Sequence, residues 1–299
     1  MPTSTFDDPD LIDQDSGNHR SSVHRLNTKA WGPMDFHSAN RKAWNQLADS
    51  GSLFAKVATD QELQNPLKVL DGRGWLPKSV KGMKVLCLAS GGGWQSILYA
   101  AAGAEVTVVD ISESMLKLDQ QEAERRSLKV TTMHASMDNL PDVASESFDI
   151  VHQPVSSCYI PDLVPMFGEI ARVLKDDGVY ISQHKQPTSA QISHRNEQQQ
   201  FVIGVEYYHQ GALPRTIDTA YRESGATEYL HRWEDLVGGL CRTNMVLEDL
   251  REPVRADLNA ATNHFGYRGR FVPPYVRLKA RRKCRTDADR TESSILWTP

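Results

Sequence analysis

The stretch KVLCLASGGGWQ, residues 84–95, decides the fold of this chain. Its first residues alternate and then run apolar, as a buried parallel strand does. Gly91, Gly92 and Gly93 follow and permit a tight turn in which the backbone approaches a ligand without interference from a Cβ atom. Small side chains over residues 94–102 then predict a helix that packs closely on the sheet.

The next stretch, AAAGAEVTVVDIS, predicts a second strand over residues 105–109 that ends at Asp110. Asp110 follows Gly91 by 19 residues, a distance at which a carboxylate accepts both hydroxyls of a ribose. The GxGxxG spacing of dinucleotide-binding enzymes is absent, and the bulky pair Trp94 and Gln95 stands where a pyrophosphate would need room. The two stretches therefore predict a site for a nucleoside cofactor without phosphates.

Composition limits the classes of protein and partner. A chain of 299 residues that is 39% hydrophobic and 24% charged predicts one decorated α/β domain. A net charge of -4 and a pI near 6.2 argue against nucleic acid as a partner. The chain has no run of 18 apolar residues and no signal-peptide core, so we expect no membrane partner and a cytoplasmic location. The four cysteines show no ligand spacing and predict no metal site.

Strands and helices alternate beyond the second strand, which predicts a Rossmann-like, doubly wound α/β fold with a seven-stranded, mostly parallel sheet. The expected helices cover residues 113–127, 162–174 and 233–242, and the expected strands cover residues 129–134, 148–152, 178–184, 245–250 and 275–280. In the turn KDDG (residues 175–178), Gly178 is the residue expected in the left-handed conformation that often follows a helix.

The chain is expected to divide into six segments around this core. A helix from Ser38 belongs to an N-terminal helical extension, and an aromatic and polar insertion after the fifth strand forms a cap. The segments are a mobile tail (1–30), the extension (31–80), the cofactor-binding core (81–185), the cap (186–231), the core completion (232–282) and a C-terminal tail (283–299).

Four motifs in order resemble class I S-adenosylmethionine-dependent methyltransferases, specifically the small-molecule enzymes with a UbiE-like core. The motifs are VLCLASGGG, VTVVDIS, HASMDNLP before SFDIV, and FGEIARVLKDDGVYIS, and the resemblance covers about residues 84–253. It implies a methyltransferase that uses S-adenosyl-L-methionine and releases S-adenosyl-L-homocysteine.

The resemblance also implies which residues bind the cofactor. Asp110 would hold the ribose, Ile111 would cover the adenine, and either Ser136 or Asp138 would contact the adenine edge. The full expected set is Ala89, Ser90, Gly91, Gly93, Gln95, Asp110, Ile111, Ser136, Met137, Asp138 and Gln153. The sequence departs from the family at Cys87 and Ser136, where many relatives carry an acid, and at Ala89, where most carry glycine.

Methyl transfer from a sulfonium is an in-line displacement, so the protein mainly aligns the acceptor and excludes water. A catalytic base is optional. Sites in such sheets open at the carboxyl ends of the strands, so Tyr159 after the fourth strand and His184 at the end of the fifth are expected catalytic residues. His209 of the insertion is the third. At the start of the N-terminal helix, His37, Asn40 and Arg41 are read equally as ligand contacts or as a solvated helix start.

The leading hypothesis is methylation of a small polar metabolite, either an amino acid or a sulfur acceptor such as methionine. One alternative is a nucleic-acid or protein methyltransferase, which the acidic pI disfavours. The other is a non-catalytic regulatory protein that binds S-adenosylmethionine, which the departures at Cys87 and Ser136 motivate. The expected partner is a small-molecule acceptor, and a homodimer is one alternative for the oligomeric state.

Overall fold

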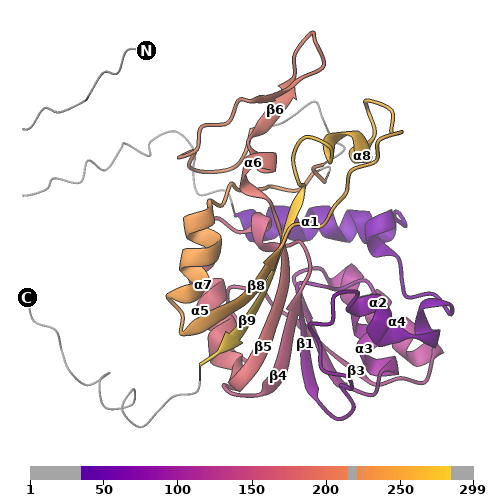
Figure 1. Cartoon of the computed structure of the whole chain (residues 1–299). Helices are drawn as coiled ribbons and strands as arrows, with labels where there is room; N and C mark the ends of the chain where they lie inside the picture. The colour runs from indigo at the N-terminus through magenta and orange to yellow at the C-terminus, as the bar shows by residue number, and fades with distance from the viewer. Residues whose placement is uncertain (1–34, 215–220, 224, 284–299) are drawn as a thin grey trace, which may run out of the picture. The chain divides into compact units, whose positions relative to one another are not determined.

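The computed structural model describes residues 35–214, 221–223 and 225–283 (Figure 1). The mobile tail expected over residues 1–30 lies outside the described residues. So does the expected C-terminal tail from residue 284 onward.

The described residues contain a sheet of seven strands in the order β3-β2-β1-β4-β5-β9-β8. Strands β1 to β5 are mutually parallel, and β9 is antiparallel to both β5 and β8. The bounds are β1 Lys84–Leu88, β2 Glu105–Asp110, β3 Val130–His134, β4 Phe148–Gln153, β5 Leu174–Lys185, β8 Met245–Arg251 and β9 Tyr275–Arg282. The predicted fold class is confirmed, and the switch in strand order between β1 and β4 marks the usual position of a ligand site.

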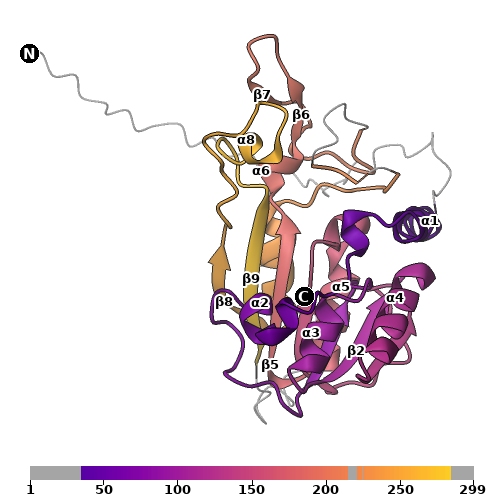
Figure 2. The same ribbon diagram turned by 90° about the vertical axis from the view of Figure 1, so that its right-hand side faces the viewer.

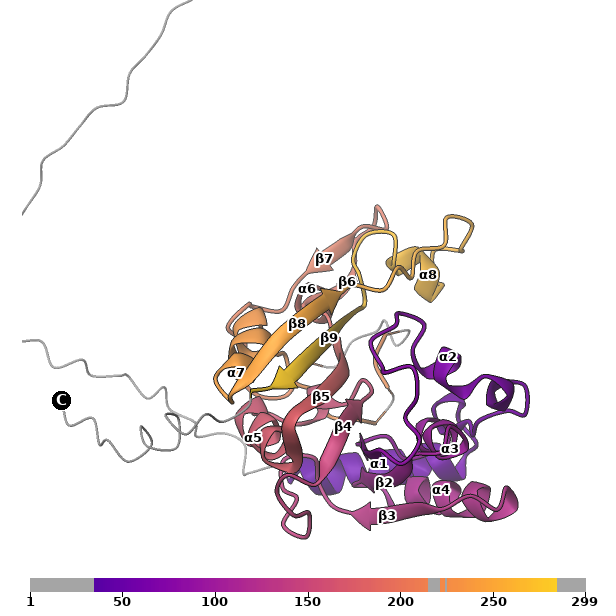
Figure 3. The same cartoon turned by 60° about the horizontal axis from the view of Figure 1, so that its bottom comes forward.

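Helices cover both faces of this sheet (Figures 2 and 3). The α-helices are α1 Phe36–Asp49, α2 Pro66–Leu70, α3 Gln95–Ala101, α4 Glu113–Arg125, α5 Leu163–Val173, α6 Pro187–Ala190, α7 Gly239–Cys241 and α8 Phe265–Arg268. Short 3-10 turns are η1 Leu53–Ala55, η2 Glu62–Gln64 and η3 Ser157–Tyr159, whereas η4 Glu234–Gly238 is a π-helix that leads into α7. A hairpin of β6 Ile192–Arg195 and β7 Phe201–Ile203 lies in the cap segment.

Strand β1 divides the core between the two faces. Its side chains alternate, so Val85 and Cys87 join a cluster that contains Tyr99 of α3, whereas Leu86 and Leu88 join the larger cluster around α5. These four β1 side chains are fully buried. The apolar run in the sequence is therefore a strand covered on both faces, as parallel strands are.

Helix α1 lies across the carboxyl ends of the strands, below the cap hairpin (Figure 1). The amide of Asn45 accepts hydrogen bonds from the Ser112 hydroxyl at 2.6 Å and from the Ser114 backbone at 3.2 Å. The amide of Asn40 donates to the Tyr159 carbonyl at 2.8 Å and accepts from the Thr227 backbone at 2.7 Å. Hydrogen bonds thus hold α1 both to the segment that follows β2 and to the cap.

The turn before β5 differs from the prediction. The left-handed residue is Asp177, with φ of 61°, and not Gly178. Strand β5 already begins at Leu174, which pairs with Phe148, and the KDDG residues bulge out before Val179 resumes the pairing. Gly178 is needed for space, because a Cβ atom there would lie 2.8 Å from the carbonyl oxygen of Lys175.

Replacing Asp177 by glycine should stabilise the protein. Glycine adopts a positive φ without the steric cost that a side chain incurs, so we expect Asp177→Gly to raise the free energy of unfolding by about 0.5–1 kcal/mol. Chemical denaturation measures the change. The neighbouring Asp176→Gly is the control and should lower stability, because it adds freedom to the unfolded chain and removes an ion pair with Arg282 at 3.7 Å. An equal loss in both variants would contradict the strain at Asp177.

Candidate active site

A cavity of 590 Å³ lies at the carboxyl edge of the sheet, where the sequence predicted a ligand site. Most of the expected cofactor-binding residues line it: Ala89, Ser90, Gly91, Gln95, Asp110, Ile111, Ser136 and Met137. Gly93, Asp138 and Gln153 are not among the lining residues. The structure therefore brings the glycine loop, the end of β2 and the loop after β3 around one space.

The glycine loop is held against the end of β2. The Gly91 backbone donates a hydrogen bond of 2.9 Å to Asp110, and a Cβ atom at Gly91 would lie only 2.7 Å from the Cβ of Met115. Ala89 has φ of 48°, a left-handed conformation that glycine adopts at lower cost, so the departure from the family at this position strains the backbone. The loop still brings Gly91 within hydrogen-bond distance of Asp110 with alanine at this position.

Asp110 presents its carboxylate to the cavity. One oxygen accepts from Gly91 and the other accepts from the Ser112 backbone at 2.9 Å. Burial raises the pKa of Asp110, and these backbone hydrogen bonds oppose that effect. Each oxygen retains a further lone pair for a ligand hydroxyl.

Asp119 of α4 is a second carboxylate at the glycine loop, and the sequence analysis did not find it. It accepts a hydrogen bond of 2.8 Å from the Gly92 backbone and another from the Ser96 hydroxyl. Burial raises its pKa to about 7. Asp119 follows the buried Met115 by one helical turn, so both residues lie on the buried face of α4. An acidic residue among the apolar positions of this face was the feature of the sequence that could have indicated it.

Ser136 and Asp138 were alternatives for the adenine edge, and Ser136 is the one that lines the cavity. Its hydroxyl donates to Asp138, which also contacts His37 of α1 at 3.2 Å. Gln153 is fully buried and holds the core instead. Its amide accepts from Tyr180 at 2.5 Å and donates to Ser156 at 2.9 Å.

The three expected catalytic residues do not come together. Tyr159 lines the cavity, and burial raises its pKa well above the usual value. His184 lies between the hydroxyls of Ser157 and Ser182 at 2.7 and 2.8 Å, and its pKa falls to about 3, mainly because of burial. His209 contacts the carbonyl of Ala212 at 3.1 Å. Neither histidine is a lining residue, so only Tyr159 is placed to meet a ligand.

The residues at the start of α1 have different surroundings. His37 and Asn40 line the cavity, but the hydrogen bonds of Asn40 already join α1 to the cap. Arg41 is nearly half exposed and lies 4.0 Å from Glu113. A solvated helix start describes Arg41 best.

The cap, the loop after β8 and the last strand contribute lining residues that no sequence motif predicts. Glu223, Arg255 and Tyr275 complete the end of the cavity beside Tyr159. Lys185 of β5 lies behind them, 2.9 Å from Glu223 and 2.9 Å from Glu228. No sequence motif predicts these residues, because only the packing of the cap against the sheet brings them together.

Comparisons with known proteins agree with this geometry. A family model described as a methyltransferase domain matches residues 86–182. The protein named uncharacterized methyltransferase YbaJ of Bacillus subtilis is 34% identical over 215 residues, which cover 67% of this chain and 84% of that protein. The chain belongs to the class I S-adenosylmethionine-dependent methyltransferases. The predicted family, enzyme class and cofactor are thereby confirmed.

Other relatives share less with this methyltransferase. The ubiquinone biosynthesis O-methyltransferase of Actinobacillus pleuropneumoniae is 31% identical over 121 residues, and the match covers 39% of this chain and 51% of that enzyme. An S-adenosylmethionine-dependent methyltransferase from Mesorhizobium loti has a similar fold, with a TM-score of 0.56 and 21% identity over 74% of this chain and 100% of that chain. Geranyl diphosphate C-methyltransferase from Streptomyces coelicolor has a TM-score of 0.56 at 14% identity, over 84% and 99% of the two chains.

Over residues 35–214, 221–223 and 225–283, no helix has the length and apolar character that a membrane crossing requires. No group of three or more histidine, cysteine or acidic side chains in the same part of the chain is arranged to hold a metal ion.

Asp119 should make stability depend on pH. Its pKa rises from 3.8 to about 7 on folding, so between these values the folded state binds more protons than the unfolded state and the free energy of unfolding falls as pH rises. We expect Asp119→Asn to remove about 2–4 kcal/mol of this fall between pH 4 and 7.5, as measured by urea denaturation. Glu124→Gln, an exposed site on the same helix, should keep the wild-type slope. Identical slopes in all three proteins would contradict a protonated Asp119.

Proposed function

We propose that this methyltransferase transfers a methyl group to a small polar molecule, which binds beside its cofactor in the 590 Å³ cavity. The observation that carries the proposal is that one space has two differently built ends. The glycine loop and Asp110 lie at the ends of β1 and β2, whereas Tyr159, Glu223 and Tyr275 lie at β4, β5 and β9, on the other side of the switch in strand order. A cavity in this size range accommodates small molecules.

The first end fits S-adenosylmethionine. The side-chain oxygen of Gln95 is buried and has no hydrogen-bond partner among the described residues, so it offers an acceptor for the ammonium group of the methionine part. Asp110 offers the same to the ribose hydroxyls, and Ile111 and Met137 offer apolar contact to the adenine. Ser136 is placed to contact the adenine edge. When bound, the cofactor supplies an activated methyl group.

The second end suits a polar acceptor with an apolar part. Trp44 and Tyr159 meet edge to face, with ring centroids 5.4 Å apart. Glu223 and Arg255 add charges of opposite sign to the lining. These two charges support an acceptor of the amino acid type, because a carboxylate pairs with an ammonium group and a guanidinium pairs with a carboxylate.

A macromolecular acceptor finds less support. Helix α1 and the cap lie over the carboxyl ends of the strands, and the pI of 6.2 gives no basic surplus for a nucleic acid. The residues at the two ends of the cavity therefore favour a small acceptor over the nucleic-acid or protein alternative.

Asp110→Asn tests the cofactor half of the proposal. The substitution removes a charged acceptor for the ribose, so we expect the affinity for S-adenosylhomocysteine to fall about 10- to 100-fold by calorimetry. Asp142→Asn replaces an exposed carboxylate with the same charge change and should bind as the wild type does. Equal affinities for the three proteins would remove Asp110 from the cofactor site.

Transfer of a radiolabelled methyl group to a panel of amines, alcohols, carboxylates, thiols and thioethers tests the acceptor half. We expect transfer to at least one small polar acceptor, and product analysis identifies the methylated atom. Tight cofactor binding without transfer to any of them would favour the regulatory alternative.

A further inference from the structure

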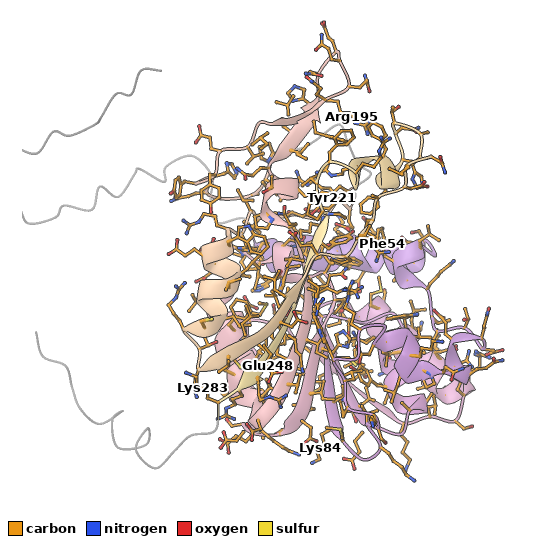
Figure 4. All side chains as sticks on the ribbon, viewed as in Figure 1. Phe54, Lys84, Arg195, Tyr221, Glu248 and Lys283 are labelled. Carbon is orange, nitrogen blue, oxygen red and sulfur yellow. The ribbon has the colours of Figure 1, made fainter. Side chains whose placement is uncertain are left out.

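Glu223 is a buried carboxylate on the acceptor side of the cavity. Its side chain is 9% exposed and lines the space next to Tyr159, whose hydroxyl hydrogen-bonds to it. Tyr221, two residues earlier, lies where the cap meets the upper ends of the strands (Figure 4). Glu223 is therefore a charged group of the cap that faces the same space as the cofactor loop.

Lys185 keeps this carboxylate ionised. Burial by itself would raise the pKa of Glu223, but the charge and the hydrogen bond of Lys185 outweigh it and lower the pKa. The ammonium nitrogen of Lys185 lies 2.9 Å from Glu223 and donates a 2.9 Å hydrogen bond to the Tyr221 carbonyl. Lys185 is itself buried at the end of β5, so its charge is poorly screened by water.

Glu228 gives Lys185 a second counter-ion. It lies 2.9 Å from Lys185 and 3.4 Å from Arg222, and its side chain is 1% exposed. Glu228 is not among the lining residues of the cavity. Burial and the charge of Glu223 raise the pKa of Glu228. If Glu223 takes up a proton, that repulsion ends and Glu228 remains beside Lys185 as its counter-ion, so neutralising Glu223 does not leave a buried charge unpaired.

We propose that Glu223 accepts the proton that the methyl acceptor loses, and that the acceptor is therefore an amine or a hydroxyl compound. This inference rests on the proposed function. As the acceptor nitrogen or oxygen bonds to the methyl carbon, the carbon–sulfur bond breaks and its electron pair neutralises the sulfonium. The acceptor proton passes to Glu223, so atoms and charge balance.

The inference separates the acceptor classes that the sequence left open. A thioether such as methionine has no proton on its nucleophilic atom and gains nothing from a base. An ionised carboxylate beside the acceptor instead favours a nucleophile that carries a proton. Of the two candidates from the sequence, the amino acid type is the one that this arrangement supports.

Binding of three matched compounds tests the inference without turnover. Benzylamine, benzyl alcohol and benzyl methyl sulfide present an amine, a hydroxyl and a thioether on the same ring, and calorimetry measures their affinity for the protein saturated with S-adenosylhomocysteine. We expect the amine or the alcohol to bind at least 10-fold more tightly than the sulfide. Glu223→Gln should reduce that preference below 3-fold and leave the affinity for S-adenosylhomocysteine unchanged. Glu206→Gln, an exposed cap residue, is the control.

Kinetics with an acceptor found in the panel provide the second readout. A general base contributes about 10²–10⁴-fold, so we expect Glu223→Gln to lower kcat by at least about 100-fold with a smaller change in KM. Its rate should rise with pH, because deprotonation in solution replaces the missing base, whereas the wild-type rate should level off. Among the described residues, the other titratable or charged groups near Glu223 are Lys185, Tyr159, Cys158, Glu228 and Tyr275, and Arg255 lines the same end of the cavity. Glu223→Asp should restore part of the rate.

The outcomes distinguish the two proposals. A wild-type protein that neither binds S-adenosylhomocysteine nor transfers a methyl group overturns the proposed function. Normal cofactor binding with a Glu223→Gln variant that matches the wild type in binding preference and kcat overturns the inference alone. A preference for the sulfide, or transfer confined to thioethers, also overturns it.

Discussion

The close approach of the glycine loop to the end of β2 is the constraint on which the rest of the site depends. The Gly91 backbone binds Asp110 at 2.9 Å, and Met115 leaves no room for a side chain at Gly91. This hydrogen bond joins the loop after β1 to the end of β2, next to the point where the strand order switches from β1 to β4. One side of the loop lies against α4, and residues of the loop line the cavity. Helix α3 begins directly after the loop, at Gln95.

The end of the cavity that we propose for the acceptor is built differently. Its residues come from α1, the loop after β4, the cap, the loop after β8 and β9, which are far apart in the sequence. Buried ionic and hydrogen-bonding contacts hold them together: Lys185 of β5 binds Glu223 and Glu228, and Asn40 joins Tyr159 to Thr227. Removing one partner of such a buried set leaves another polar group unpaired, so each of these contacts depends on the others being in place. Local backbone geometry thus forms the end proposed for the cofactor, and side-chain contacts between distant segments form the end proposed for the acceptor.

This contrast explains how much the sequence could predict. Strand β1, the glycine turn and Asp110 are neighbours along the chain, and their spacing alone placed Gly91 and Asp110 at one cavity. His184 and His209 are predicted from their chemistry alone. In the structure, hydroxyl groups bind both ring nitrogens of His184, and a backbone carbonyl contacts the ring of His209. Neither histidine lines the cavity. The role proposed for Glu223 could not be predicted, because it depends on Lys185, 38 residues earlier. The error at Gly178 has a local cause, since aspartate also tolerates the left-handed conformation found at Asp177.

The departures from the family at β1 have a structural counterpart on α4. Cys87 is fully buried where many relatives carry an acid, and the charge of Asp119 contributes, after burial, to the raised pKa of its thiol. Asp119 accepts the hydrogen bond of the Gly92 backbone and that of Ser96, so a carboxylate still holds the glycine loop although it comes from a helix and not from the strand. The absence of an acid at Cys87 was one reason to consider a protein that binds the cofactor without catalysis. With Asp119 in place, that absence no longer separates this chain from an enzyme, and Ser136 lines the cavity where its hydroxyl can serve a ligand.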